Sequence, residues 1–178
     1  MSSDERFMEV ALLQAAKSLK ENTLPVGCVV VQDDEVIGTG RKLSSDFHLG
    51  HAEVYALRAA LGGKKFSPAD RISLYSTLEP CIMCFGAILH CPIRRVIFAL
   101  HDPYGGATDL PISVLPVRQR QRTVEVQGGL LRSRSKALFQ EFFLSTTDSV
   151  WTDSSNPLVR YVMDEPNAET QLPQPLVC

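Results

Sequence analysis

Two short segments carry residue types that could bind a metal and move protons. His51 and Glu53 lie two apart, and Cys81 and Cys84 lie three apart directly behind Pro80. Cysteines at that spacing on one helix share a face and can reach the same metal. At the start of a helix the positive end of the dipole favours their thiolate forms. Two thiolates and one imidazole suit Zn²⁺, so we expect zinc on His51, Cys81 and Cys84.

Three protein ligands leave the fourth tetrahedral position of zinc to water. Zinc lowers the pKa of such a water to roughly 7 and makes hydroxide available as a nucleophile at neutral pH. Glu53 is not needed as a ligand. It is placed to take the proton of the water and to deliver it to a ring nitrogen and then to a departing amine. The pattern therefore predicts a hydrolytic site with Glu53 as its proton shuttle.

Two other interpretations of the same residues remain open. A closed zinc site, with Cys28, Cys91 or His90 as fourth ligand, would make the chain a non-catalytic zinc-binding module. Glu53 and the lack of a second C-x-x-C fit that module poorly. A redox-active cysteine pair is disfavoured because a proline precedes the motif and bulky residues separate its cysteines.

Periodicity and turn residues predict the elements that position these segments. Apolar side chains at helical spacing predict a first helix over residues 4–20, with Ser3 or Asp4 as its cap. The other expected elements are a hairpin of strands 26–31 and 36–40, a helix over 51–61, a strand over 72–78, a helix over 81–91, a strand over 96–100, a loop over 101–121, a strand over 123–126 and a helix over 132–144. This order predicts an α/β fold, a three-layer α/β/α sandwich around a five-stranded mixed sheet.

We expect one zinc-dependent domain over residues 1–144 and a C-terminal tail over residues 145–178. The tail is spotted with prolines and carries five acids against one arginine, a net charge of −4. Trp151, Leu158 and Tyr161 are expected to dock its first part on the body. Two basic clusters in the body are interpreted as solvated faces, with a phosphate-contacting patch as the alternative. They comprise Arg118, Arg120 and Arg122, and Arg132, Arg134 and Lys136.

Composition indicates a reducing compartment. The five cysteines are odd in number and irregularly spaced, which argues against a disulfide framework. No apolar run approaches the roughly 20 residues that span a bilayer. The first residues lack the basic start and apolar stretch of a signal peptide. We therefore expect a cytoplasmic protein with no membrane partner.

The segments around both motifs resemble the cytidine/deoxycytidylate deaminase superfamily, whose signature is H-x-E followed by P-C-x-x-C. Several stretches look most like bacterial tRNA adenosine deaminases, and together they cover roughly residues 5–144. These stretches are Pro25-Val26-Gly27 and residues 51–58, 74–90, 102–107 and 124–131.

The resemblance implies an α/β/α sandwich, a homodimer, zinc on His51, Cys81 and Cys84, and proton transfer by Glu53 during deamination of an amino-nucleobase. It also implies residues that bind the substrate. The backbone around Ala52 and Leu78-Glu79 would face the base, and Val26 would form one wall. Lys42 stands where family members carry an asparagine that helps to hold the substrate.

The resemblance leaves the substrate open. Members of the family carry Asp-Pro-Thr-Ala before the zinc histidine, where this chain reads Phe47-His48-Leu49-Gly50. We expect conversion of adenosine to inosine at the anticodon wobble position of tRNA, with a free base, nucleoside or nucleotide (guanine, cytosine or a related ring) as the alternative. An RNA substrate would need aromatic side chains to stack unpaired bases, for which Phe47, Tyr104 and Phe142 or Phe143 are the candidates.

Overall fold

A computed structural model describes residues 1–45, 48–64, 67 and 70–164 of the chain. Phe47 and the part of the tail from Glu165 onward therefore lie outside the described residues. The described chain forms a five-stranded sheet with the order β2-β1-β3-β4-β5. β1 pairs antiparallel with β2 and β3, whereas β3, β4 and β5 run parallel to one another. No helix among the described residues has the length and apolar character needed to cross a bilayer.

The elements follow the predicted order. The strands are β1 (Gly27–Gln32), β2 (Glu35–Arg41), β3 (Ile72–Leu78), β4 (Ile93–Leu100) and β5 (Glu125–Gln127). The helices are α1 (Ser3–Lys20), α2 (Ala52–Leu61), α3 (Ile82–His90), η1 (Ile112–Val114), α4 (Val117–Arg120), α5 (Arg132–Ser145), α6 (Ser149–Thr152) and α7 (Pro157–Asp164).

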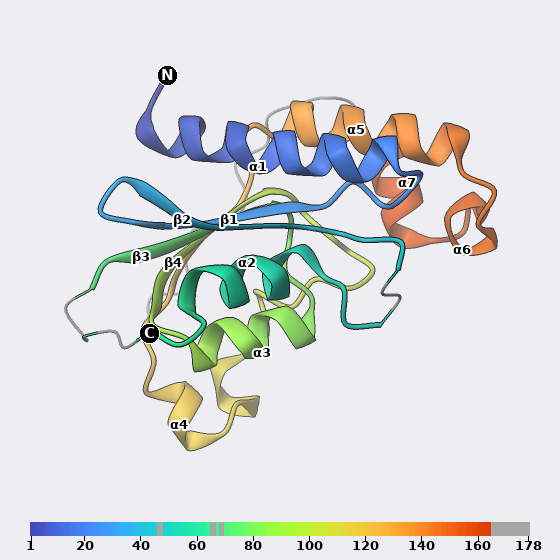
Figure 1. The fold of residues 1–178 in the computed structure, drawn as a ribbon. Helices are drawn as coiled ribbons and strands as arrows, with labels where there is room; N and C mark the ends of the chain where they lie inside the picture. Colours follow the sequence, from blue (N-terminus) through green and yellow to red (C-terminus); the bar gives the residue numbers. More distant parts are fainter. Residues whose placement is uncertain (46–47, 65–66, 68–69, 165–178) are drawn as a thin grey trace.

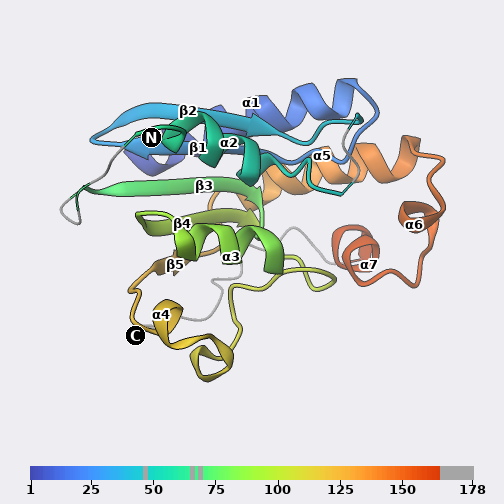
Figure 2. The same ribbon diagram turned by 60° about the horizontal axis from the view of Figure 1, so that its bottom comes forward.

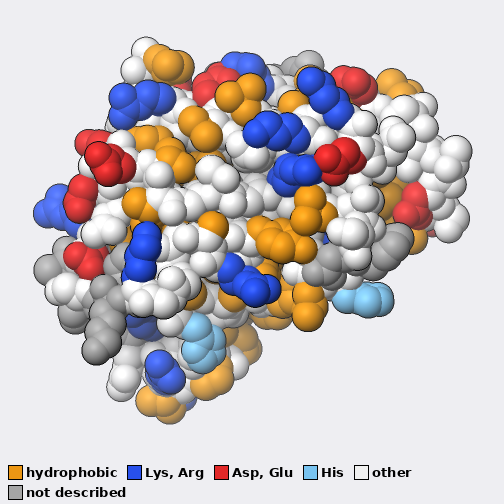
Figure 3. Space-filling view, viewed as in Figure 1, with side chains coloured by type: hydrophobic (Ala, Val, Ile, Leu, Met, Phe, Trp, Pro, Cys, Tyr) orange, Lys and Arg blue, Asp and Glu red, His pale blue; other side chains and the backbone are white. Residues whose placement is uncertain are grey.

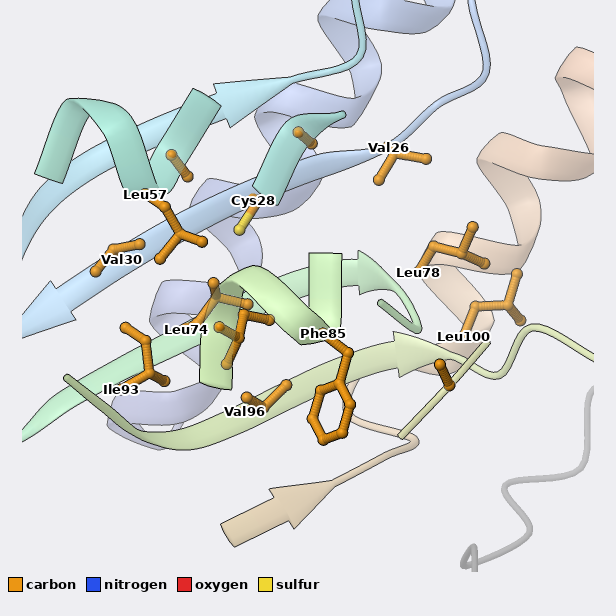
Figure 4. Packing of buried hydrophobic residues seen from close by; sticks show 14 of the residues in the cluster. Val26, Cys28, Val30, Leu57, Leu74, Leu78, Phe85, Ile93, Val96 and Leu100 are labelled. Atoms are coloured by element: carbon orange, nitrogen blue, oxygen red, sulfur yellow. The ribbon is translucent and has the colours of Figure 1, made fainter. Parts of the chain in front are cut away.

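Helices cover both faces of the sheet, with α1 and α5 on one side and α2 and α3 on the other (Figures 1 and 2). Because successive side chains of a strand point to opposite faces of the sheet, the buried residues divide between these two sides. Val29 and Val31 of β1 pack in the cluster beneath α1. Cys28 and Val30, which alternate with them, pack toward α2 and α3 in the cluster of Figure 4. The predicted α/β/α sandwich around a mixed sheet is confirmed.

Glycines bring the helices unusually close to the hairpin. A Cβ on Gly40 of β2 would lie 2.0 Å from the carbonyl oxygen of Ala52, and a Cβ on Gly27 of β1 would lie 2.1 Å from that of Ala11. Neither position has room for a side chain. The start of α2 is therefore seated directly against the backbone of β2.

Some local predictions were wrong. The cap of α1 is Ser2, not Ser3 or Asp4, because Ser2 and Glu5 form a reciprocal capping box. Asp4 instead accepts hydrogen bonds from Tyr75 and Arg95 and ties α1 to the sheet. The stretch 101–121 is not a continuous loop, since it contains η1 and α4. β4 also begins three residues before its expected start, because its ladder to β3 extends back to Ile93.

In the second basic cluster Arg134 is exposed as expected, but the other two residues are not solvated. Arg132 and Lys136 are both buried on α5, and the guanidinium of Arg132 lies 5.0 Å from the ring centroid of Tyr161 in α7. Leu158 of α7 belongs to the main hydrophobic cluster, and Trp151 of α6 packs against that cluster. α6 and α7 thus lie against the end of α5, as Figure 1 shows.

Candidate metal centre and active site

The N-termini of α2 and α3 bring the two motifs together. His51 is the N-cap residue of α2, and Cys81 is the N-cap residue of α3, with Cys84 in the first turn. Nδ1 of His51 lies 3.5 Å from Sγ of Cys81 and 3.4 Å from Sγ of Cys84. One donor atom from each of the three residues lies within 4.8 Å of the others.

This donor set fits zinc. Typical Zn–S and Zn–N bonds at a tetrahedral angle place sulfur and nitrogen roughly 3.6 Å apart, close to the spacing observed here. The geometry also selects Nδ1 as the ring nitrogen that faces both thiols. Three protein donors in this arrangement leave one tetrahedral position to a fourth ligand.

Without metal, the pKa values of the two thiols shift in opposite directions. A hydrogen bond from Cys84, reinforced by His51, outweighs burial and lowers the pKa of Cys81 to about 4. The same contact with Cys81, together with burial, raises the pKa of Cys84. Hydrogen bonding to Cys81 also raises the pKa of His51. Metal binding to this group must therefore displace protons.

Glu53 sits beside the donor set in a buried position. Its side chain is 3% exposed, and its Oε1 accepts a hydrogen bond from Ser76 of β3 at 3.3 Å. Its Oε2 lies 3.5 Å from Sγ of Cys84. Burial is the main cause that raises the pKa of Glu53. A carboxyl group with a raised pKa is better able to accept and release protons near neutral pH.

Glu79 holds the loop that follows β4. Its buried carboxylate accepts hydrogen bonds from the backbone of Asp102 and Thr108, from the Thr108 hydroxyl, and from His101. Burial alone would raise the pKa of Glu79, but these hydrogen bonds outweigh it and lower the pKa. A Cβ on Gly106 would lie 2.4 Å from Oε2 of Glu79, so glycine lets the loop close over the carboxylate.

A cavity of about 840 Å³ opens over this centre. Its lining includes His51, Glu53 and Cys81. It also includes all five residues expected to bind the substrate, namely Val26, Lys42, Ala52, Leu78 and Glu79. Cys84 is buried behind this lining. The side chain of Glu79 is engaged by the loop, as described above, and its backbone N–H donates to Leu100.

Most of the far wall of the cavity was not predicted from the sequence, which offered only Phe142 of this wall as a residue that contacts the substrate. It comes from the end of α5 and the segment that follows, and comprises Phe142, Ser145, Thr146, Thr147, Asp148 and Trp151. The sequence signals for it were Phe142, a candidate for base stacking, and Trp151, expected to dock the tail on the body. Spacing could not show that this tryptophan returns to the site, because the return depends on how α5 packs on the sheet.

Comparison with known proteins assigns the family. The model of the cytidine and deoxycytidylate deaminase zinc-binding region matches residues 1–100. A tRNA-specific adenosine deaminase of Streptococcus pyogenes serotype M18 is 36% identical over 140 residues, which are 77% of this chain and 87% of the relative. One from Agrobacterium fabrum is 33% identical over 148 residues, covering 80% and 95% of the two chains.

Solved structures agree with this assignment. A structure from studies of A-to-I editing by tRNA:A34 deaminases superposes with a TM-score of 0.65 at 32% identity, covering 75% of this chain and 98% of its own. Acinetobacter baumannii RibD matches with a TM-score of 0.57 at 28% identity, covering 79% of this chain but 38% of its own. The expectation of zinc is confirmed by the zinc-binding region and the donor set together. The chain is a zinc-dependent deaminase and belongs to the cytidine and deoxycytidylate deaminase family.

Proposed function

We propose that this deaminase converts adenosine to inosine at the anticodon wobble position of tRNA. The observation that carries the proposal is the match to tRNA-specific adenosine deaminases over nearly their whole length. The match to a tRNA:A34 deaminase structure extends it to the wobble position. The cavity supports the proposal because Val26 and Leu78 place apolar side chains against a base beside the metal centre.

In this proposal His51 through Nδ1, Cys81 and Cys84 hold zinc. Zinc bound there supplies Lewis acidity, which makes water a nucleophile near neutral pH. Glu53 accepts one proton of the attacking water and delivers it to N1 of adenine. It then takes the second proton from the oxygen added at C6 and passes it to the amine, which leaves as ammonia. The Ser76 hydroxyl fixes one oxygen of Glu53, so the other remains on the side of the donor set.

The remaining substrate contacts are assigned from the same cavity. The backbone at Ala52 and Leu78-Glu79 faces the base, and Val26 forms one wall. The backbone of Lys42 is held by hydrogen bonds with Val26 and Ser18. Its side chain contributes a positive charge at the position where the family resemblance implies an asparagine. This charge suits the sugar-phosphate of a nucleotide.

We further propose a cytoplasmic homodimer. Exposed apolar side chains on α3, η1 and α4 supply a candidate interface, namely Ile82, Val114 and Val117. The four described cysteines are free thiols, which suits a reducing compartment. Sedimentation at micromolar concentration tests the dimer, and a monomer there would contradict it. Fractionation of the source cells tests the compartment.

The function is tested by offering the purified zinc-loaded protein two kinds of substrate. Total tRNA is assayed for inosine by sequencing, and adenosine, guanine and cytosine are assayed for ammonia release. We expect inosine at the wobble position, with a kcat/KM that falls steeply as salt rises from about 50 to 200 mM because phosphate contacts release counterions. Ammonia release from a free base, insensitive to salt and without inosine in tRNA, would overturn the proposal.

A further inference from the structure

The cavity has a buried end and an exposed end. Glu53, at the metal centre, is 3% exposed, whereas Tyr104, in the loop after β4, is 57% exposed and lines the same cavity. The exposed part of the lining also includes Asn22, Ser44, Thr147 and Asp148, so a substrate larger than one base must extend over a rim of which Tyr104 is part. Whatever lies next to the reacting base in that substrate meets the residues at the exposed end.

Aromatic side chains line the exposed end of the cavity. The Trp151 and Phe143 rings are stacked, with centroids 5.9 Å apart and an interplanar angle of 23°. Trp151 also meets Tyr104 edge to face, with centroids 6.3 Å apart and an angle of 78°. Both Trp151 and Tyr104 line the cavity. Phe143 covers one face of the indole, and the partly exposed Trp151 contributes to the cavity wall.

Trp151 is held in place by its own segment. Asp148 caps α6 by accepting a hydrogen bond from the Val150 backbone at 2.9 Å. Asn156 donates to the Val150 carbonyl at 3.3 Å and caps the start of α7, which Leu158 anchors in the core. The aromatic pair is thus formed before a substrate arrives, so stacking on it costs little ordering of the protein.

The charges of the cavity lining disfavour phosphate at the aromatic end. Among the described lining residues Lys42 is the one lysine or arginine, against Glu53, Glu79, Asp102 and Asp148. On the face seen in Figure 3, lysines and arginines are spread among other side chains instead of forming one band. The aromatic end beside Asp148 therefore suits the uncharged face of a base better than a phosphate. Base–aromatic stacking is the contact that single-stranded nucleic acid makes with such a surface.

We propose that Tyr104 and Trp151 form a stacking platform for the unpaired base next to the reacting adenosine in an RNA loop. The inference rests on the proposed function and adds a specificity determinant to it. α6 supplies half of the platform and lies beyond the part of the chain that the family model matches.

The sequence offers a direct probe, because Trp151 is the sole tryptophan of the chain. The full-length zinc-loaded protein is titrated with an anticodon stem-loop RNA that carries adenosine at the wobble position. Matched RNAs carry an abasic residue at one of the two neighbouring nucleotides. We expect saturable quenching of tryptophan fluorescence by the intact RNA. One abasic RNA should bind without quenching and show a KM for inosine formation raised roughly 5- to 150-fold.

Substitutions in the protein complete a double-mutant cycle with the abasic RNAs. Trp151→Ala and Tyr104→Ala should raise the KM for intact RNA by a similar factor. In neither variant should the KM rise further when the abasic RNA replaces the intact RNA. Trp151→Phe should retain most of the affinity. Val150→Ala, on the same helix and outside the cavity lining, is the matched control and should behave as wild type. Because Tyr104 is exposed, its truncation keeps the test informative if Trp151→Ala fails to fold.

The outcomes separate the two proposals. Inosine formation with unquenched tryptophan, or with additive losses from Trp151→Ala and the abasic residue, overturns the stacking platform and leaves the proposed function standing. No inosine from the wild-type protein overturns the proposed function, and the platform with it.

Discussion

At the scale of single residues, Glu53 is a buried carboxyl group with a hydroxyl and a metal-binding thiol among its side-chain partners. Ser76 holds one of its oxygens, and Cys84 lies against the other. Because Glu53 is not one of the three donors, which are His51, Cys81 and Cys84, its loss should leave metal binding intact. This separation between holding the metal and moving the proton can be tested directly.

We expect Glu53→Gln to lower kcat for inosine formation by at least about 100-fold, because glutamine keeps the size of the side chain but cannot shuttle a proton. Zinc content, measured by mass spectrometry of the purified variant, should equal that of wild type. Glu35→Gln, at an exposed position where β2 begins, serves as the control and should keep full activity. Loss of zinc from Glu53→Gln would instead indicate that this residue belongs to a structural metal site.

At the scale of elements, the sequence predicted the order of strands and helices because hydrophobic periodicity is a local property. It also placed both motifs at helix starts, where the structure has them. Other features depend on contacts between distant segments. Glu79 was expected near the substrate, but nothing local showed that its side chain holds residues 101–108. The choice of Nδ1 on His51 likewise follows only from where α3 lies relative to α2.

The anchoring of α1 is a second example of such long-range pairing. Asp4 accepts hydrogen bonds from Arg95 on β4 and from Tyr75 on β3. The Arg95 hydrogen bond is the main cause that lowers the pKa of Asp4, against burial. A carboxylate with a lowered pKa stabilises the fold above its unfolded pKa, and this contribution is lost as pH falls through the folded pKa.

We therefore expect Asp4→Asn to lower the free energy of unfolding by about 1 kcal/mol at pH 7, a modest value because the ion pair is partly exposed and screened. The difference from wild type should shrink as pH drops below about 4. Urea unfolding at a series of pH values measures it. Asp34→Asn, in the exposed turn between β1 and β2, provides the comparison. A difference that stays constant down to pH 3 would show that the Asp4 charge is not the cause.

At the scale of the whole molecule, the boundary at residues 144 and 145 is a proposal about how the chain is divided. We propose that the segment 145–164 follows the deaminase domain in sequence but unfolds together with it. Leu158 is 1% exposed inside the main cluster, and Gln140 of α5 donates to the Val162 carbonyl of α7. A segment with such contacts shares the stability of the body.

Leu158→Ala should lower the free energy of unfolding by about 2–5 kcal/mol while the transition stays single. Leu144→Ala is the matched control, because Leu144 is 76% exposed and its truncation should change little. Urea unfolding followed by circular dichroism and by Trp151 fluorescence gives both numbers. If the two probes reported separate transitions, the tail would be an independent unit.

The glycine contacts of the hairpin carry a consequence for how this enzyme can be altered. Gly40 and Gly27 admit no larger residue, so a mutation at Gly40 would shift α2 and, with it, His51, and a mutation at Gly27 would shift α1. Residues 145–148 and Trp151 reach the same cavity from the other end of the sequence, on a segment without such glycines. A mutant library confined to this segment should therefore change which substrates are accepted while the chemistry survives.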